Sequence, residues 1–95
     1  MTNRIRDIVR AVETMHECKA EYESSEVVME QFRGQTVWDG VVEVFRLTDH
    51  PKTTRCYGWS YLDSGEPRYV TVLELPPVNS ACTAVRAAIA SGQQK

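Results

Sequence analysis

The sequence lacks the features that would place it in several large classes of protein. Its apolar runs are only a few residues long, so no segment is expected to span a membrane. The first ten residues alternate charged with aliphatic side chains and contain no apolar core of an export signal. The cysteines are odd in number and widely spaced: Cys18, Cys56 and Cys82. Free thiols without an export signal predict a cytoplasmic protein.

An excess of basic charge is also missing. The chain has 11 Lys and Arg against 13 Asp and Glu, which gives a net charge of −2. Nucleic acids and anionic membranes both attract basic surfaces, so neither is an expected partner. No motif assigns a reaction, and no cofactor is expected.

What is present is the composition of an ordinary globular protein, with 42% hydrophobic and 25% charged residues. The length of 95 residues predicts a single domain, 1–95, in which 92–95 form a frayed tail. A chain of this size buries only about two-thirds of its unfolded surface, so an interface with another chain would add stability.

The first expected element is an amphipathic helix that is capped by Thr2 or Asn3 and ends near Glu17. The pair Ser24-Ser25 favours a break before the next element. Apolar residues recur three and four positions apart and form the buried stripe of this helix: Ile5, Ile8, Val9, Val12 and Met15.

Four later segments have the composition of strands. The first is 27–32, whose start could lie several residues earlier, and the clearest is 36–47, rich in Val and aromatic residues. The others are 55–61 and 69–75, joined by a hairpin loop. In the clearest strand both alternating sets of side chains are partly apolar, which predicts a sheet with two apolar faces.

A second helix, 81–91, is predicted from its end signals. Ser80 is a favourable cap, and Gly92 stands where a left-handed terminator is expected. The expected inner stripe contains small side chains, which allow close approach to a sheet: Cys82, Val85, Ala88 and Ile89.

The predicted fold is therefore α+β: an antiparallel β-meander of three to four strands with an N-terminal and a C-terminal helix. Both helices are expected on one face of the sheet, which leaves the other apolar face uncovered. Either the N-terminal helix wraps around the sheet, or the uncovered face meets another subunit. A homo-oligomer, most simply a dimer through this apolar sheet face, is the preferred explanation.

Two sets of thiol and imidazole side chains suggest chemistry. A metal site would use His16, Cys18, His50 and Cys56, yet their spacings match no zinc motif, and no metal is expected. A nucleophilic Cys56 with His50 as its base would form a catalytic pair. A solvated imidazole and a small buried thiol explain the same residues without any chemistry.

An aromatic stripe is a third candidate, for binding. Alternation places four side chains on one side of the third strand, with Trp38 and Tyr69 on other strands: Arg55, Tyr57, Trp59 and Tyr61. Sheets that bind single-stranded nucleic acid present aromatic residues beside arginine in this way. Burial of the stripe under a helix is several times more common, and subunit interfaces also favour such residues.

The order of a helix, a three-strand meander and a helix resembles that of double-stranded RNA-binding domains. The alanine-rich final helix is similar to the last helix of that family. The family's helix opens with lysines that grip phosphates, whereas this one opens with 79–83 and has only Arg86 further on. The resemblance implies a shared topology and no phosphate-binding role.

Two segments resemble those of a group of small uncharacterised bacterial proteins. They are 34–45, with the sequence GQTVWDGVVEVF, and 50–59, which contains HPK and RCYGW. The ending of Pro76-Pro77-Val78 and the helix AVRAAI at 84–89 fits the same group. The resemblance covers about the C-terminal two-thirds of the chain, implies a bacterial source and supplies no function.

The function expected from these features is that of a small non-enzymatic binding or accessory domain that acts as a homo-oligomer. The alternative is a small enzyme or ligand-binding protein with a pocket near His50, Cys56, Trp38 and Trp59. Nucleic-acid binding through the aromatic face ranks lowest because of the net charge of −2.

Overall fold

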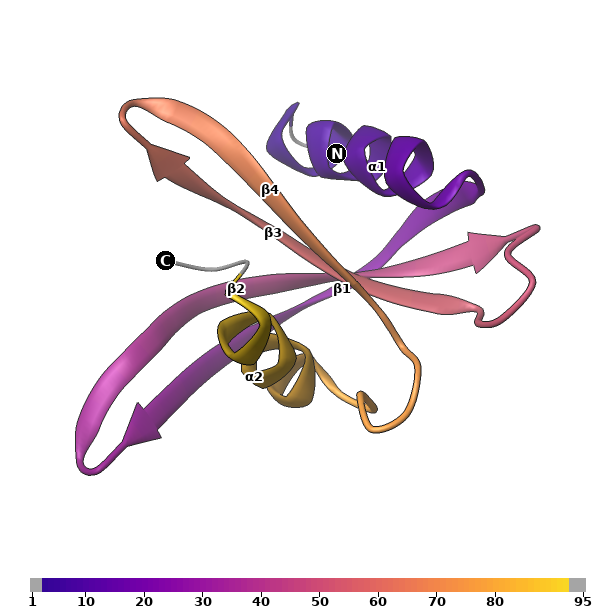
Figure 1. Cartoon of the computed structure of the whole chain (residues 1–95). Helices are drawn as coiled ribbons and strands as arrows, with labels where there is room; N and C mark the ends of the chain where they lie inside the picture. Colours follow the sequence, from indigo (N-terminus) through magenta and orange to yellow (C-terminus); the bar gives the residue numbers. More distant parts are fainter. Residues whose placement is uncertain (1–2, 93–95) are drawn as a thin grey trace.

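An antiparallel meander of four strands lies between an N-terminal and a C-terminal helix in this computed structural model, which describes residues 3–92 (Figure 1). The sheet order β1-β2-β3-β4 follows the chain. The predicted α+β class and meander are confirmed. The elements are α1 (Asn3–His16), β1 (Lys19–Phe32), β2 (Gln35–Thr48), β3 (Arg55–Asp63), β4 (Glu66–Leu73) and α2 (Ala81–Ser91).

Tight two-residue turns close the β1–β2 and β3–β4 hairpins. Arg33 and Gly34 in the first turn, and Ser64 and Gly65 in the second, all have positive φ. Positive φ at both central residues matches the twist of the flanking strands, which is why such turns join hairpins. A longer loop, 49–54, joins β2 to β3.

The two helices cover opposite faces of the sheet, so the prediction that they share one face was wrong. On β3, the buried Trp59 belongs to the cluster that contains the inner residues of α2, whereas Cys56 belongs to the cluster that contains Ile8 of α1. A Cβ added to Gly58 would meet Ile8 at 2.9 Å, which places α1 closely over this point. Each apolar face therefore has its own helix.

The end signals of α2 are confirmed. Ser80 and Thr83 form a capping box, and Gly92 ends the helix with a φ of 79°. At the start of α1, Asn3 is itself the first helical residue, and Thr2 lies outside the described residues. Residues 93–95 of the predicted tail also lie outside them.

The predicted helix stripes need three corrections. In α1, Ile8 and Val12 are fully buried, but Met15 is exposed near the helix end. In α2, Cys82 and Ile89 are exposed. Small residues still form the inner face of this helix, at Ala81, Ala84, Val85 and Ala88.

Strand β1 begins eight residues before the predicted position 27, at Lys19. Its pairing with β2 is interrupted between Tyr22 and Ser24, where Glu23 is an extra residue. Before this bulge, Ala20 packs in the α1 cluster. After it, Val28 packs in the α2 cluster, so a single strand contributes to both cores.

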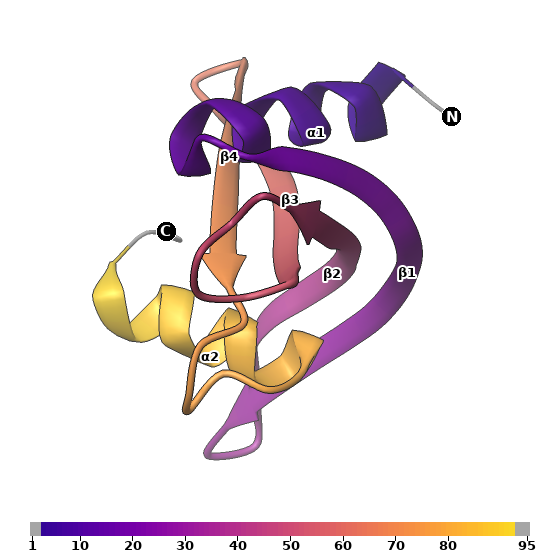
Figure 2. The same cartoon turned by 90° about the vertical axis from the view of Figure 1, so that its right-hand side faces the viewer.

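The sheet splits along the line between β2 and β3. Pairing between these strands covers four residue pairs only, from Glu43–Gly58 to Arg46–Arg55. Before Glu43 in β2 and after Gly58 in β3 the strands no longer pair, and the β1–β2 hairpin diverges from the β3–β4 hairpin. Figures 1 and 2 show the two hairpins as separate arms. The first half of β2 therefore pairs with β1 alone.

Candidate functional site

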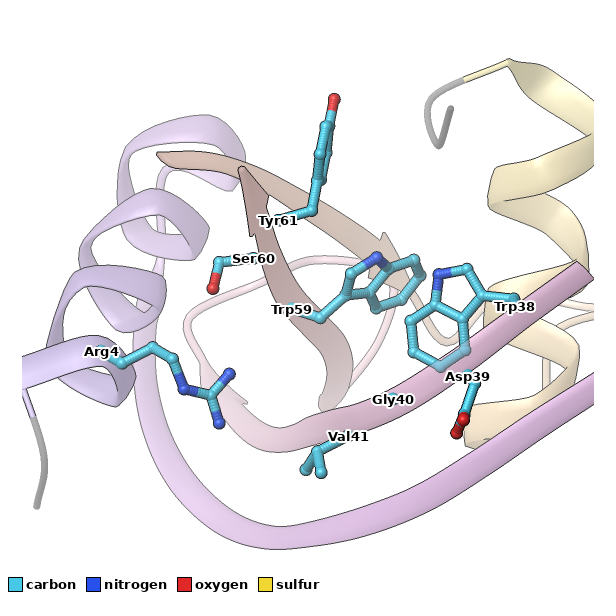
Figure 3. A pocket seen from close by; sticks show the side chains of 8 residues that line it. All are labelled: Arg4, Trp38, Asp39, Gly40, Val41, Trp59, Ser60 and Tyr61. Carbon is cyan, nitrogen blue, oxygen red and sulfur yellow. The ribbon is translucent and has the colours of Figure 1, made fainter. Parts of the chain in front are cut away.

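A cleft of about 370 Å³ lies where the two hairpins diverge (Figure 3). This volume is near the lower end of the range of small-molecule and cofactor sites, about 300–1,000 Å³. Arg4 comes from α1, and the other side chains come from β2 and β3. The cleft is lined by Arg4, Trp38, Asp39, Gly40, Val41, Trp59, Ser60 and Tyr61.

Two indoles meet in the cleft. The rings of Trp38 and Trp59 lie edge to face, with centroids 5.4 Å apart, a favourable aromatic geometry. A Cβ at Gly40 would stand 3.1 Å from the ring of Trp38, so a glycine allows this ring to lie over the strand. The predicted neighbourhood of Trp38 and Trp59 is thus present, and Tyr61 stands beside Trp59 (Figure 3).

A buried carboxylate borders the cleft on the α1 side. Glu43 is fully buried, and it accepts a hydrogen bond from Arg4 at 2.5 Å. Ser25 also donates to it, and the Ser25 hydroxyl contacts the hydroxyl of Tyr22 at 2.6 Å. These contacts neutralise and orient a charge that burial alone would disfavour, and they fix the start of α1 over β2.

Backbone groups of both strands are directed into the cleft. Leu47 donates its N–H to the carbonyl of Thr54, so the odd residues of β2 face β3. By the same alternation, Asp39 and Val41 direct N–H and C=O toward the cleft, beyond the last β2–β3 pair. The even residues of β3, Ser60 and Leu62, do the same from the other side.

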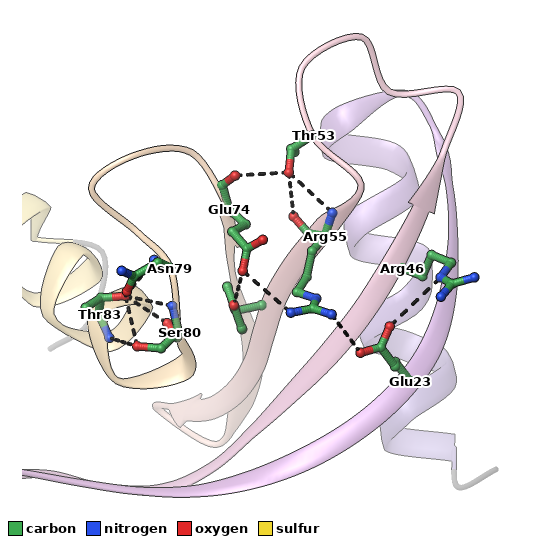
Figure 4. Close-up of polar contacts among 9 residues, drawn as sticks. Glu23, Arg46, Thr53, Arg55, Glu74, Asn79, Ser80 and Thr83 are labelled. Atoms are coloured by element: carbon green, nitrogen blue, oxygen red, sulfur yellow. Dashed lines mark hydrogen bonds and ion pairs between the residues drawn. The ribbon is translucent and has the colours of Figure 1, made fainter.

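The predicted aromatic stripe is largely core. Tyr57 and Trp59 are buried against α2, which removes them from a stacking platform. The Tyr57 hydroxyl donates to Glu74, and burial, followed by this bond, raises the pKa of Tyr57 to about 12. Arg55 pairs with Glu23 at 3.3 Å and with Glu74 at 3.8 Å, within a surface network (Figure 4).

The structure brings two of the predicted metal ligands together. The rings of His16 and His50 are 6.4 Å apart. His16 Nε2 contacts the Thr71 hydroxyl at 2.8 Å, and His50 Nδ1 accepts a backbone N–H from Lys52 at 3.1 Å. Within residues 3–92, no three His, Cys, Asp or Glu side chains are grouped so that they could hold a metal ion.

The thiols are poorly suited to nucleophilic attack. Cys56 is completely buried, and burial raises its pKa to about 12, so it stays protonated at neutral pH. Burial, followed by Glu13 and Asp49, also raises the pKa of Cys18. Neither Cys56 nor His50 lines the cleft.

Apolar side chains remain exposed on the β1–β2 hairpin beyond the reach of α1. Val27 and Val41 are direct cross-strand partners and are 83% and 38% exposed. Met29, two residues along β1, is 56% exposed. These three residues are called the hairpin patch below. They share the sheet face of Ser25 and Glu43, and therefore of α1.

Sequence reasoning missed Arg4, Glu43 and the divergence of the hairpins. A glutamate between apolar neighbours in a strand was one available signal for Glu43. The divergence had none, because strand composition does not show where pairing stops.

No protein-family model, curated protein or solved structure matches the chain. Across the described residues, no helix combines the length and the apolar character needed to cross a membrane.

Proposed function

We propose that the chain is a non-enzymatic binding domain that acts as a homodimer, joined through the hairpin patch. The observation that supports this most is Val27, an aliphatic side chain 83% exposed on a regular strand. With Val41 and Met29 it forms a continuous apolar strip, and such strips on otherwise polar surfaces typically mark interfaces.

A second copy of the chain is the occupant that a self-complementary apolar patch favours. Arg4 and Asp39 stand on either side of Val41 in Figure 3, but Arg4 is already paired with Glu43, so the surroundings of the patch do not select a charged partner. A two-fold contact places the patch of one copy on the same apolar strip of the other, which buries both. Phe32 and Val37 are also exposed, but they line a groove with Arg86 and Ile89 of α2 and so lie outside the patch.

The high pKa of Cys56 disfavours the enzymatic alternative, in which Cys56 is the nucleophile. The cleft at Trp38 and Trp59 supports the ligand-binding part of that alternative. Binding without chemistry accommodates both observations.

Sedimentation equilibrium from low to high micromolar concentration tests the dimer. We expect Met29→Lys to weaken the dimer roughly tenfold or more, because a charge would be buried at the contact. Met15→Lys is the matched control: Met15 is 58% exposed, close to the 56% of Met29, but lies on α1 outside the patch. A wild-type chain that stays monomeric throughout, or equal effects of the two variants, would contradict the proposal.

A further inference from the structure

The backbone around the cleft is that of an open sheet edge. Strand β2 is a central strand from Glu43 to Arg46 and an edge strand before that. Asp39 and Val41 on one side, and Ser60 and Leu62 on the other, present their N–H and C=O groups toward the gap. An extended polypeptide is the partner that satisfies such groups, because its own N–H and C=O groups alternate with the same repeat.

The cleft edges lack the protection that the outer edges of the sheet have. Natural sheets discourage strand addition with charged residues and proline. The outer strand β1 contains Lys19, Glu21, Glu23 and Glu26. The outer strand β4 begins with Glu66, Pro67 and Arg68. Between 39–42 and 59–62, by contrast, Asp39 is the one charged residue, and no proline occurs.

Side chains on the two sides of the cleft differ in character. Trp38, Trp59 and Tyr61 stand on one side, and Arg4 and Ser60 stand on the other (Figure 3). The positive charge of Arg4 is already balanced by Glu43. A strand added here would therefore direct apolar or aromatic side chains toward Trp38 and Tyr61, which are partly exposed beside the buried Trp59, and neutral polar ones toward Arg4.

We infer that the cleft binds an extended segment of another protein by strand addition, with apolar and neutral polar side chains in alternation. The inference rests on the proposed binding function and not on the dimer. A second copy of the chain is the competing occupant, and the test separates the two.

Two proline variants isolate the backbone contribution. Val41→Pro removes an N–H that points into the cleft. Val27→Pro is its matched control for peptide binding alone: Val27 is the cross-strand partner of Val41 and shares its sheet face, and both residues belong to the hairpin patch, so an effect on the patch is common to the two variants. The alternation directs the N–H of Val27 to the outer edge of β1, so neither variant removes a β1–β2 hydrogen bond.

The probe is the tightest-binding member of a displayed library of linear seven-residue peptides, selected on the full chain and then synthesised. Calorimetry is expected to show binding at least roughly tenfold weaker for Val41→Pro, and within roughly twofold of wild type for Val27→Pro. Recovery of no peptide above background, or equal binding by the two variants, would overturn the proposal.

Two measurements on the wild-type chain avoid any dependence on folding of the variants. Peptide N-methylation is expected to abolish binding at alternate positions only, because a strand directs every second N–H toward its neighbour. Amide exchange at Asp39 and Val41 is expected to slow when the peptide is added. Uniform tolerance of N-methyl groups, or unchanged exchange at both amides, would also overturn the proposal.

The same samples separate failure of the peptide site from failure of the dimer. A monomer that binds the peptide removes the dimer and keeps the site, whereas a dimer that binds no peptide does the reverse. If Val41→Pro dissociates a wild-type dimer while Val27→Pro does not, the edge belongs to a second copy, and the inference of a separate partner is wrong.

Discussion

The two halves of β2 have similar compositions and very different surroundings. From 43 to 48 the strand lies between β1 and β3 beneath α1, and Glu43, Val44, Phe45 and Leu47 are buried. From 35 to 42 it pairs with β1 alone, and Val37 and Val41 are exposed. Valine and aromatic residues occur in both halves. Apolar side chains are thus buried on both faces of the second half, whereas in the first half Trp38 and Val42 pack against the α2 core while Val37 and Val41 stay accessible.

A pair of phenylalanines provides the largest test of this difference. Phe45 is fully buried in the α1 core, whereas Phe32 is 62% exposed at the hairpin end. We expect Phe45→Ala to lower the free energy of unfolding by about 3–5 kcal/mol, and Phe32→Ala by less than about 0.5 kcal/mol. Urea denaturation measures both. Similar losses would show that the hairpin end is part of the core.

Arg4 tests the boundary between the two halves of β2. Its partner Glu43 is the first residue of β2, in chain order, that pairs with β3. Arg4→Ala leaves a buried carboxylate without its cationic donor, and we expect a loss of about 1–3 kcal/mol. The control is Arg46→Ala, since Arg46 lies 4.0 Å from Glu23 with a 71% exposed side chain. Its expected effect is within about 0.5 kcal/mol. Equal losses in urea denaturation would mean that Glu43 does not depend on Arg4.

The smallest expected effect is the pH dependence of the free energy of unfolding that comes from His16, at the end of α1. Burial, followed by His50, lowers the pKa of His16 from its ordinary 6.5, so the native state binds this proton less readily than the unfolded chain. Neutral His16 contributes its full stability when the pH is above the pKa of His16 in the unfolded chain. This contribution is lost as the pH falls through the lower pKa of His16 in the native state.

Wild type should therefore lose more stability than His16→Gln between about pH 7.5 and about pH 5, as measured by urea denaturation at both values. Equal losses would show that His16 is as easily protonated in the native state as in the unfolded chain.

Local signals predicted the elements well where end residues were decisive. Ser80 and Gly92 marked α2 at its observed bounds. The first part of β1 was missed because its exposed positions are mostly acidic and show no apolar alternation. It is a strand because it pairs with residues 42–48, and that pairing is a long-range property.

The placement of the helices could not be read from composition. The link from α1 to β1 is two residues long, whereas 74–80 join β4 to α2 and carry the chain to the other face. Of the candidate site, Trp38, Trp59 and Tyr61 were identified from aromatic character alone. Arg4 was not, because α1 precedes β2 by many residues and reaches Glu43 only in the folded chain.

The bulge at Glu23 makes the effect of a deletion in β1 depend on its position. The side chain of Glu23 forms exposed ion pairs with Arg46 and Arg55, so other residues should be tolerated at this position. Deleting the residue would remove the bulge: Ser24 would follow Tyr22 directly, their pairs with Val44 and Phe45 would stay in register, and Val28 would still face α2. A residue lost from the regular pairs between Ser24 and Glu30 is a different matter, because alternation would then turn every later side chain of the strand to the other face.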